Sequence, residues 1–139
     1  MNIELRNAIY AKCAGSALDA LINGQIYHGE APEGTRYPYV IFFNVADSDH
    51  LTFTEEFTDC LIQFSAFSAV ASSSNEIHGI KAAIKALYNE CELTIVGSTL
   101  VWINFKNAAG PMKDNEISQD GAAGGWTVHV DFEVKTSLN

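Results

Sequence analysis

An unbroken apolar run that follows a proline constrains this chain more than any other feature. Pro38 fixes its own φ and restricts Tyr37 to extended conformations, so the segment after it begins in a rigid, extended state. The run Tyr39–Phe43 (YVIFF) is apolar on both of the faces that a strand presents, which is typical of a strand covered on both sides. We predict a strand over Tyr39–Val45. Helices cover one of its faces, and the other is a candidate subunit interface.

Length and composition limit the classes of protein to which this chain can belong. The chain has 139 residues, which predicts a single domain over 1–139 with a sizeable core. It carries 8 basic and 17 acidic residues, for a net charge of −9, and this balance argues against nucleic-acid binding. We find no apolar run near the ~18 residues of a membrane span. The N-terminal residues lack the pattern of a signal peptide. The three cysteines are widely spaced, and we predict that they are buried and reduced.

Two helices are predicted from apolar residues that recur at helical spacing. The first runs from Ile3 to Ile22 in two halves, because Gly15 interrupts it and Ser16 can cap a restarted helix. The second covers residues 73–91 and has the clearest apolar stripe in the chain. We expect both helices to pack on one face of a sheet.

The strands of that sheet are predicted from runs of alternating or continuous apolar residues. Besides Tyr39–Val45, the predicted strands are Asp59–Phe67, Thr99–Lys106 and Trp126–Thr136. Gln25–His28 at an edge and Leu93–Val96 are weaker candidates for short strands. Asp47–His50 is predicted to end the central strand, Leu51–Thr58 to be a hairpin tip or mobile arm, and Asn107–Gly125 to be a long loop. The fold class is therefore α+β, with a mainly antiparallel four- to five-stranded sheet and two helices on one face.

The sequence contains no recognisable catalytic, cofactor or metal constellation. His129, Asp131 and Glu133 share one face of the last predicted strand, but alternate residues lie ~6.6 Å apart, too far for one cation to reach all three easily. The glycine-rich segment 121–125 lacks the Lys-Ser/Thr of a phosphate loop and precedes a strand. We therefore predict no enzyme activity, no cofactor and no metal.

Candidate contact residues come instead from the stretch before the central strand and from the two polar segments. An apolar second face and polar loops with isolated aromatic or Met side chains are typical of surfaces that bind other subunits. The candidate subunit or partner contacts are Pro32, Gly34, Arg36, Tyr37, Pro38, Tyr39, Phe42, Phe53, Phe57, Met112 and Ile117.

The stretch that leads into the central strand also carries a resemblance to a known family. A helix ending at Gly24 is followed by IYHGEAPEGTRYPYVIF, DCLIQFSAFS, NEIHGIKAAIKAL and the terminal WTVHVDFEV. Together these segments resemble the tail-terminator, or tail-completion, proteins of long-tailed (siphovirus-type) phages and prophages. The most specific part is Ala31-Pro32-x-Gly34-Thr35-x-Tyr37-Pro38-Tyr39, followed by the apolar strand.

The resemblance implies a structural protein with an α+β fold, a homohexameric ring and no cofactor. Such a ring caps the tail tube, ends tail polymerisation and offers a head–tail joining surface. The implied partners are further copies of the chain, the tail tube protein and a head–tail connector or neck protein. The implied location is the head-proximal end of the virion's tail, after assembly in the host cytoplasm. DNA would pass through the lumen without specific binding, which fits an acidic chain.

Two alternatives stay open at this point. Another neck or head–tail connector protein would bind portal-side partners instead of the tube. A small ligand-binding or enzymatic α+β domain, the less favoured alternative, would require a pocket with convergent polar groups.

Overall fold

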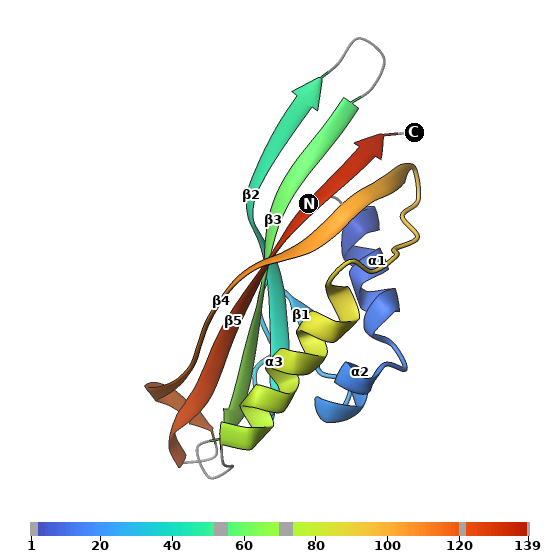
Figure 1. Cartoon of the computed structure of the whole chain (residues 1–139). Helices are drawn as coiled ribbons and strands as arrows, with labels where there is room; N and C mark the ends of the chain where they lie inside the picture. The colour runs from blue at the N-terminus through green and yellow to red at the C-terminus, as the bar shows by residue number, and fades with distance from the viewer. Residues whose placement is uncertain (1–2, 52–55, 70–73, 120–121, 139) are drawn as a thin grey trace.

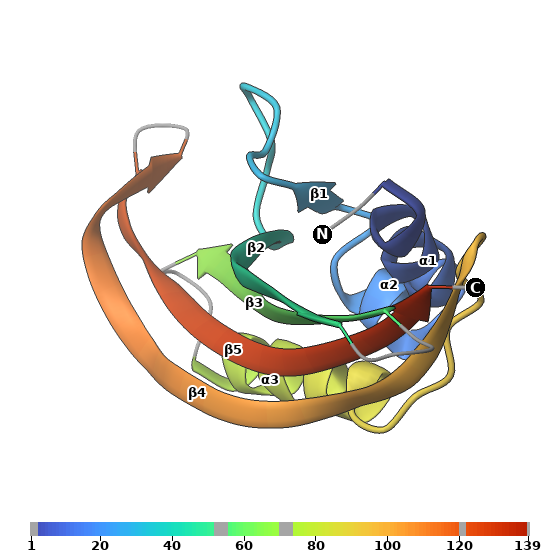
Figure 2. The ribbon, with the colours of Figure 1, turned by 90° about the horizontal axis from the view of Figure 1, so that it is seen from above.

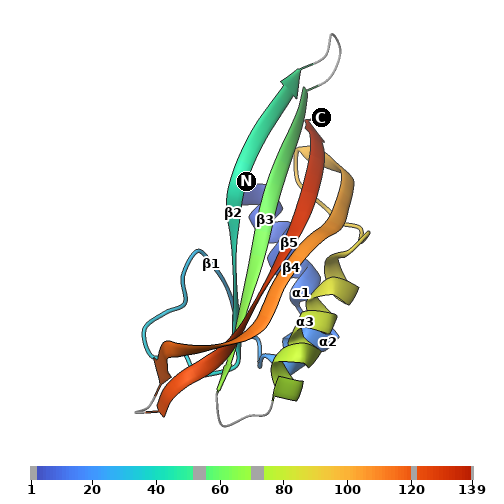
Figure 3. The ribbon, with the colours of Figure 1, turned by 60° about the vertical axis from the view of Figure 1, so that its left-hand side comes forward.

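A long, twisted sheet carries all three helices on one of its sides (Figures 1 and 3). The computed structural model describes residues 3–51, 56–69, 74–119 and 122–138. In chain order the elements are α1 (Ile3–Cys13), α2 (Ala17–Leu21), β1 (Ile26–His28), β2 (Tyr39–Leu51), β3 (Glu56–Ala69), α3 (Ser74–Tyr88), β4 (Ser98–Gln119) and β5 (Ala122–Leu138). No helix in the described part of the chain is long and apolar enough to cross a membrane.

The first predicted helix is two separate helices, α1 and α2. Gly15 has a φ of +75°, a conformation that glycine adopts easily, and its N–H donates to Asp19 Oδ2 over 3.0 Å. Ser16 then caps α2, since its Oγ accepts a hydrogen bond from the Asp19 N–H at 3.2 Å. The predicted break is confirmed, and with α3 the described residues form three helices where two were predicted.

The sheet is largely antiparallel, as predicted, but it is mixed. Its five strands lie in the order β1-β2-β3-β5-β4. Strand β1, the predicted short edge strand, pairs parallel with Val40–Phe42 of β2, and the other neighbours pair antiparallel. A parallel β1 follows from the connection, because residues 29–38 carry the chain back to the end of the sheet where β1 began.

The predicted end of the central strand at Asp47 is wrong. Strand β2 continues to Leu51 across a bulge between Asn44 and Ala46, and it pairs with β3 over this whole length. Glu56–Thr58 belongs to β3, while residues 52–55 of the predicted arm lie outside the described residues. Polar side chains do not end a strand whose backbone groups are paired on a hairpin partner.

The predicted long loop Asn107–Gly125 is also wrong. Strand β4 runs to Gln119 and β5 begins at Ala122, so the two form one long hairpin with several bulges. Its Gly, Ala and polar residues hide the apolar alternation on which the prediction depended. The predicted strand Leu93–Val96 is irregular chain and turn.

The two hairpins lie at opposite ends of the sheet: the β2–β3 hairpin extends past the helices, and the β4–β5 hairpin curls away from them (Figures 1 and 3). We call their outer parts the β2–β3 arm (residues 46–51 and 56–59) and the β4–β5 arm (residues 112–119 and 122–127). Figure 2 shows β3, β5 and β4 as successive curved bands, with β4 outermost. The molecule is thus an elongated sheet with two arms.

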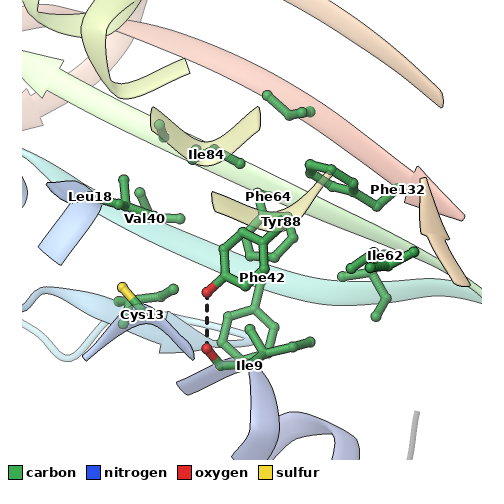
Figure 4. Packing of buried hydrophobic residues seen from close by; sticks show 14 of the residues in the cluster. Ile9, Cys13, Leu18, Val40, Phe42, Ile62, Phe64, Ile84, Tyr88 and Phe132 are labelled. Atoms are coloured by element: carbon green, nitrogen blue, oxygen red, sulfur yellow. Dashed lines mark hydrogen bonds between the residues drawn. The ribbon is translucent and has the colours of Figure 1, made fainter. Parts of the chain in front are cut away.

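The core lies between the helices and the sheet and is centred on four aromatic side chains (Figure 4). This aromatic cluster consists of Phe42, Phe64, Tyr88 and Phe132, each 0% exposed. The Phe64 ring lies 4.6 Å from Tyr88 and 5.5 Å from Phe132, measured between centroids. The Tyr88 hydroxyl donates to the Ile9 carbonyl over 2.9 Å and so fastens α3 to α1.

Both edges of the sheet are bonded locally to neighbouring elements, the β4 edge to the turn that follows α3 and the β1 edge to α1. At the β4 edge, the Phe105 N–H donates to Asn89 Oδ1 and the Glu90 N–H donates to the Ile103 carbonyl, both over 2.8 Å. At the β1 edge, the His28 N–H donates to the Tyr10 hydroxyl over 2.8 Å. These contacts occupy backbone groups that would otherwise be open to strand addition.

The substitution Asn89→Ala tests the closure of the β4 edge. We expect it to lower the free energy of unfolding by about 1 kcal/mol, because the Phe105 N–H loses its acceptor. Urea denaturation measures the change. The exposed Asn104→Ala is the control and is expected to stay within about 0.5 kcal/mol of wild type. Equal effects of the two substitutions would contradict a special role for Asn89.

Candidate assembly surface

The side of the sheet opposite the helices, which we call the outer face, is a candidate assembly surface. Alternation along β2 directs Val40 and Phe42 into the core and Tyr39, Ile41 and Phe43 to the outer face. These three outward side chains are half-buried. The predicted two-sided apolar strand is therefore present, and its second side is not covered by a helix.

Aromatic rings line one end of the outer face. The Tyr37 and Tyr39 rings stack with centroids 5.8 Å apart, and Tyr39 stacks on Phe67 at 4.9 Å. The register carries the same row across the sheet from Phe67 to Thr127 and on to Met112, whose side chain is 43% exposed. The structure thus brings candidate residues from the central strand and from the predicted long loop into one row, which we call the aromatic row.

The loop before β2 lies at the same end of the sheet as the β4–β5 arm (Figure 3). The Gln25 side-chain amide donates to the carbonyls of Arg36 and Pro38, each over 2.9 Å, and fixes the end of the loop. Pro32 and Gly34 are exposed, as is Arg36. The loop therefore presents these predicted contact residues from an anchored base.

Polar pairs occupy the centre of the outer face. Gln63 donates to Asp131 over 2.9 Å, and the Ser65 hydroxyl is hydrogen-bonded to His129 Nδ1 at 2.7 Å. Glu133 instead faces Lys106 at 3.7 Å. His129, Asp131 and Glu133 thus each have a different cross-strand partner. Among the described residues, no group of three or more His, Cys, Asp or Glu side chains could hold a metal ion.

A lysine between two aromatic rings lies at the other end of the outer face. The Lys135 ammonium is 4.9 Å from the centroid of Phe57 and 4.9 Å from that of Trp102. Phe57 is a predicted contact residue and is half-buried, whereas Trp102 is 39% exposed and was not predicted as a contact. Its place in the predicted strand Thr99–Lys106 was the signal, because Trp102 alternates with core-facing residues there.

One predicted contact residue is not on this surface, and two others have side chains outside the described part of the chain. Phe42 is 0% exposed and belongs to the aromatic cluster, so its side chain is part of the core of the folded chain. Phe53 lies outside the described residues. Ile117 lies in β4, and its side chain is also outside the described part.

The three cysteines have thiols that favour the protonated state. Burial raises the pKa of Cys13 and Cys91, and it raises that of Cys60 to about 12, where a hydrogen bond to Asp47 adds to the effect. All three are free thiols. Since the thiolate is the nucleophile and the metal ligand, these side chains behave as small core residues at neutral pH.

Comparisons with known proteins agree with this architecture. A component of the virion of a native gene transfer agent particle superimposes with a TM-score of 0.76 at 18% identity, over 96% of this chain and 95% of that one. A second solved structure has a TM-score of 0.60 at 11% identity, over 97% of this chain and 93% of that one. Both likenesses concern the fold. None of the curated proteins matches significantly.

The family comparison covers most of the sequence. Residues 7–134 match the family model described as tail completion protein gp17. This range includes the aromatic row, the loop before β2 and both arms. The chain therefore belongs to the tail completion protein gp17 family and is a structural, tail-related phage protein.

Proposed function

We propose that the protein forms a homohexameric ring that caps the tail tube, ends tail polymerisation and provides the head–tail joining surface. The observation that carries this proposal is the pair of arms at opposite ends of one continuous sheet (Figures 1 and 3). A cap between a tube and a head needs two separate contact surfaces, one above and one below the ring. An elongated subunit with an arm at each end supplies both.

The two ends differ in chemistry. The end with the aromatic row presents Tyr37, Tyr39 and the exposed Met112 beside the anchored loop. The β2–β3 arm is acidic, because residues 47–59 contain five Asp or Glu and no Lys or Arg. Aromatic and Met side chains are enriched at protein interfaces, whereas acidic ones are depleted at their cores. We assign the aromatic end to the tail tube protein and the acidic end to a connector or neck protein.

The proposed location is the head-proximal end of the tail in the virion. Membership of the tail completion family supports it, and so does the likeness to a protein of a gene transfer agent virion. A ring of chains that each carry −9 would have an acidic lumen on average, which discourages passing DNA from binding there.

The test is to mix the purified protein with tail tube protein and to look for capped tubes by negative-stain microscopy. Wild type is expected to form rings and to end tubes. Met112→Asp is expected to lose tube binding by at least about tenfold, because it places a charge in the aromatic row.

The control is Leu21→Asp, at a side chain that is 46% exposed on α2, on the helical side. It introduces the same charge and is expected to bind tubes like wild type. A protein that stays monomeric and never joins tubes would refute the proposal. Binding to a portal-side protein in place of the tube would favour a different neck component.

A further inference from the structure

A ring of identical subunits has a head-to-tail contact, so each subunit must present two different lateral surfaces that fit one another. The order of strands places β1 at one lateral edge and β4 at the other. The edge backbone near the core is already bonded to Tyr10 on one side and to Asn89 and Glu90 on the other. At these positions the backbone groups are occupied, so we look to side chains for the contact. The inference rests on the proposed ring.

The β4 edge carries an acidic groove with an apolar rim. A cavity of about 680 Å³ lies between the segment Glu90–Ile95 and the start of β4. Glu90 and Glu92 are exposed, and they are the charged members of the described lining, which includes no Lys or Arg. Trp102, which lines the groove, is 39% exposed, and Val96, next to the lining residue Ile95, is 79% exposed. Exposed apolar side chains gathered at a sheet edge are typical of an interaction surface.

The opposite edge carries a basic side chain without a full set of partners. Arg6 on α1 is half-buried, its Nε is buried without a hydrogen-bond partner, and its guanidinium reaches Asn7 only at 3.5 Å. Arg6 lies beside β1: burial lowers the pKa of His28, and the charge of Arg6 lowers it further. Ile3, one turn earlier on the same side of α1, is 60% exposed. Because buried polar groups are normally hydrogen-bonded, we infer that this guanidinium nitrogen finds its acceptor in another molecule.

We propose that the groove between Glu90–Ile95 and β4 of one subunit receives the Ile3–Arg6 side of α1 from a second copy of the chain. Arg6 then faces Glu90 and Glu92, and Ile3 faces the apolar rim at Trp102. In this contact a basic side chain faces acidic ones, and apolar side chains face apolar ones. Because the two surfaces lie on different edges of the same sheet, the contact repeats around a closed ring.

The test is a charge exchange, measured by light scattering and negative-stain microscopy under the conditions in which wild type forms rings. Arg6→Glu and Glu92→Arg are each expected to weaken subunit association by about tenfold or more, through like-charge contact. The combined variant restores opposite charges and is expected to recover most of the association. Lys81→Glu on α3 changes the net charge as Arg6→Glu does, and it is expected to have no effect.

Circular dichroism shows whether each variant folds. If Arg6→Glu does not fold, Arg6→Gln with Trp102→Ala tests the same contact without a reversed charge. The proposed contact would be wrong if folded single variants formed rings normally, or if the combined variant recovered no association. Either result would leave the proposed function standing. A wild-type protein that never forms rings would overturn both.

Discussion

Replacing Phe64 with alanine is expected to lower the free energy of unfolding by about 3–5 kcal/mol. The ring is 0% exposed and lies at the centre of the aromatic cluster, in contact with Phe42, Tyr88 and Phe132. Its removal takes away buried apolar surface and leaves a cavity between β3 and α3 that neighbouring rings cannot fill. Since domains of this size are stable by only about 5–15 kcal/mol, much of the stability would be lost.

Guanidinium denaturation followed by circular dichroism measures this effect. Two variants serve as controls. Phe64→Leu keeps most of the volume and is expected to cost less than Phe64→Ala, about 1–1.5 kcal/mol. Phe67→Ala removes an equal ring from the outer face, where the side chain is only half-buried, and is also expected to cost less. A similar loss for Phe64→Ala and Phe67→Ala would contradict the location of the core on the helical side.

The sequence predicts best those parts of the fold whose side chains divide between core and solvent. Along β5, Val128, Val130, Phe132 and Val134 are all buried, and the polar residues between them lie on the outer face. Strong alternation of this kind identifies a strand and its buried face together. The same logic located α3, whose apolar stripe contacts the sheet.

The β4–β5 arm could not be predicted, because its side chains do not divide between core and solvent. Its strands, Asp114–Gln119 paired with Ala122–Gly125, extend beyond the core, so no apolar face is required of them. Their backbone groups are paired with one another, and the composition looks like that of a loop. The polar part of β2 from Asp47 to Leu51 was misread in the same way, since β3 supplies its partner.

The candidate surface was predicted residue by residue but not as an arrangement. Sequence reasoning identified Tyr39 and Met112 as contacts on different segments. Only the register through Phe67 and Thr127 shows that they share one row. Trp102 was not predicted as a contact, although its alternation with the buried Ile103 places it on the outer face. A single sequence does not reveal that its ring lies against Lys135 there.

Raising the pH above about 9 is expected to destabilise the protein steeply, because several buried groups can lose their protons only when the chain unfolds. Burial raises the pKa of the core groups Cys13, Cys60 and Tyr88. A raised native pKa gives stability that is complete below the unfolded pKa and is lost as the pH rises toward the native value. For Cys60, with a native pKa of about 12, the loss approaches ~1.4 kcal/mol per pH unit above about 9.

Denaturation midpoints measured between about pH 8 and pH 11 test this expectation, and tyrosinate absorbance reports when the tyrosines ionise. Wild type is expected to unfold cooperatively with base, with tyrosinate from Tyr88 appearing together with the loss of structure. Cys60→Ala removes one of the groups, so its stability should fall less steeply with pH even though it starts lower. The control, the exposed Asn104→Ala, keeps the wild-type slope. Stability that is unchanged across this range would show that these side chains reach solvent in the folded protein, contrary to the packing of α1 and α3 against the sheet.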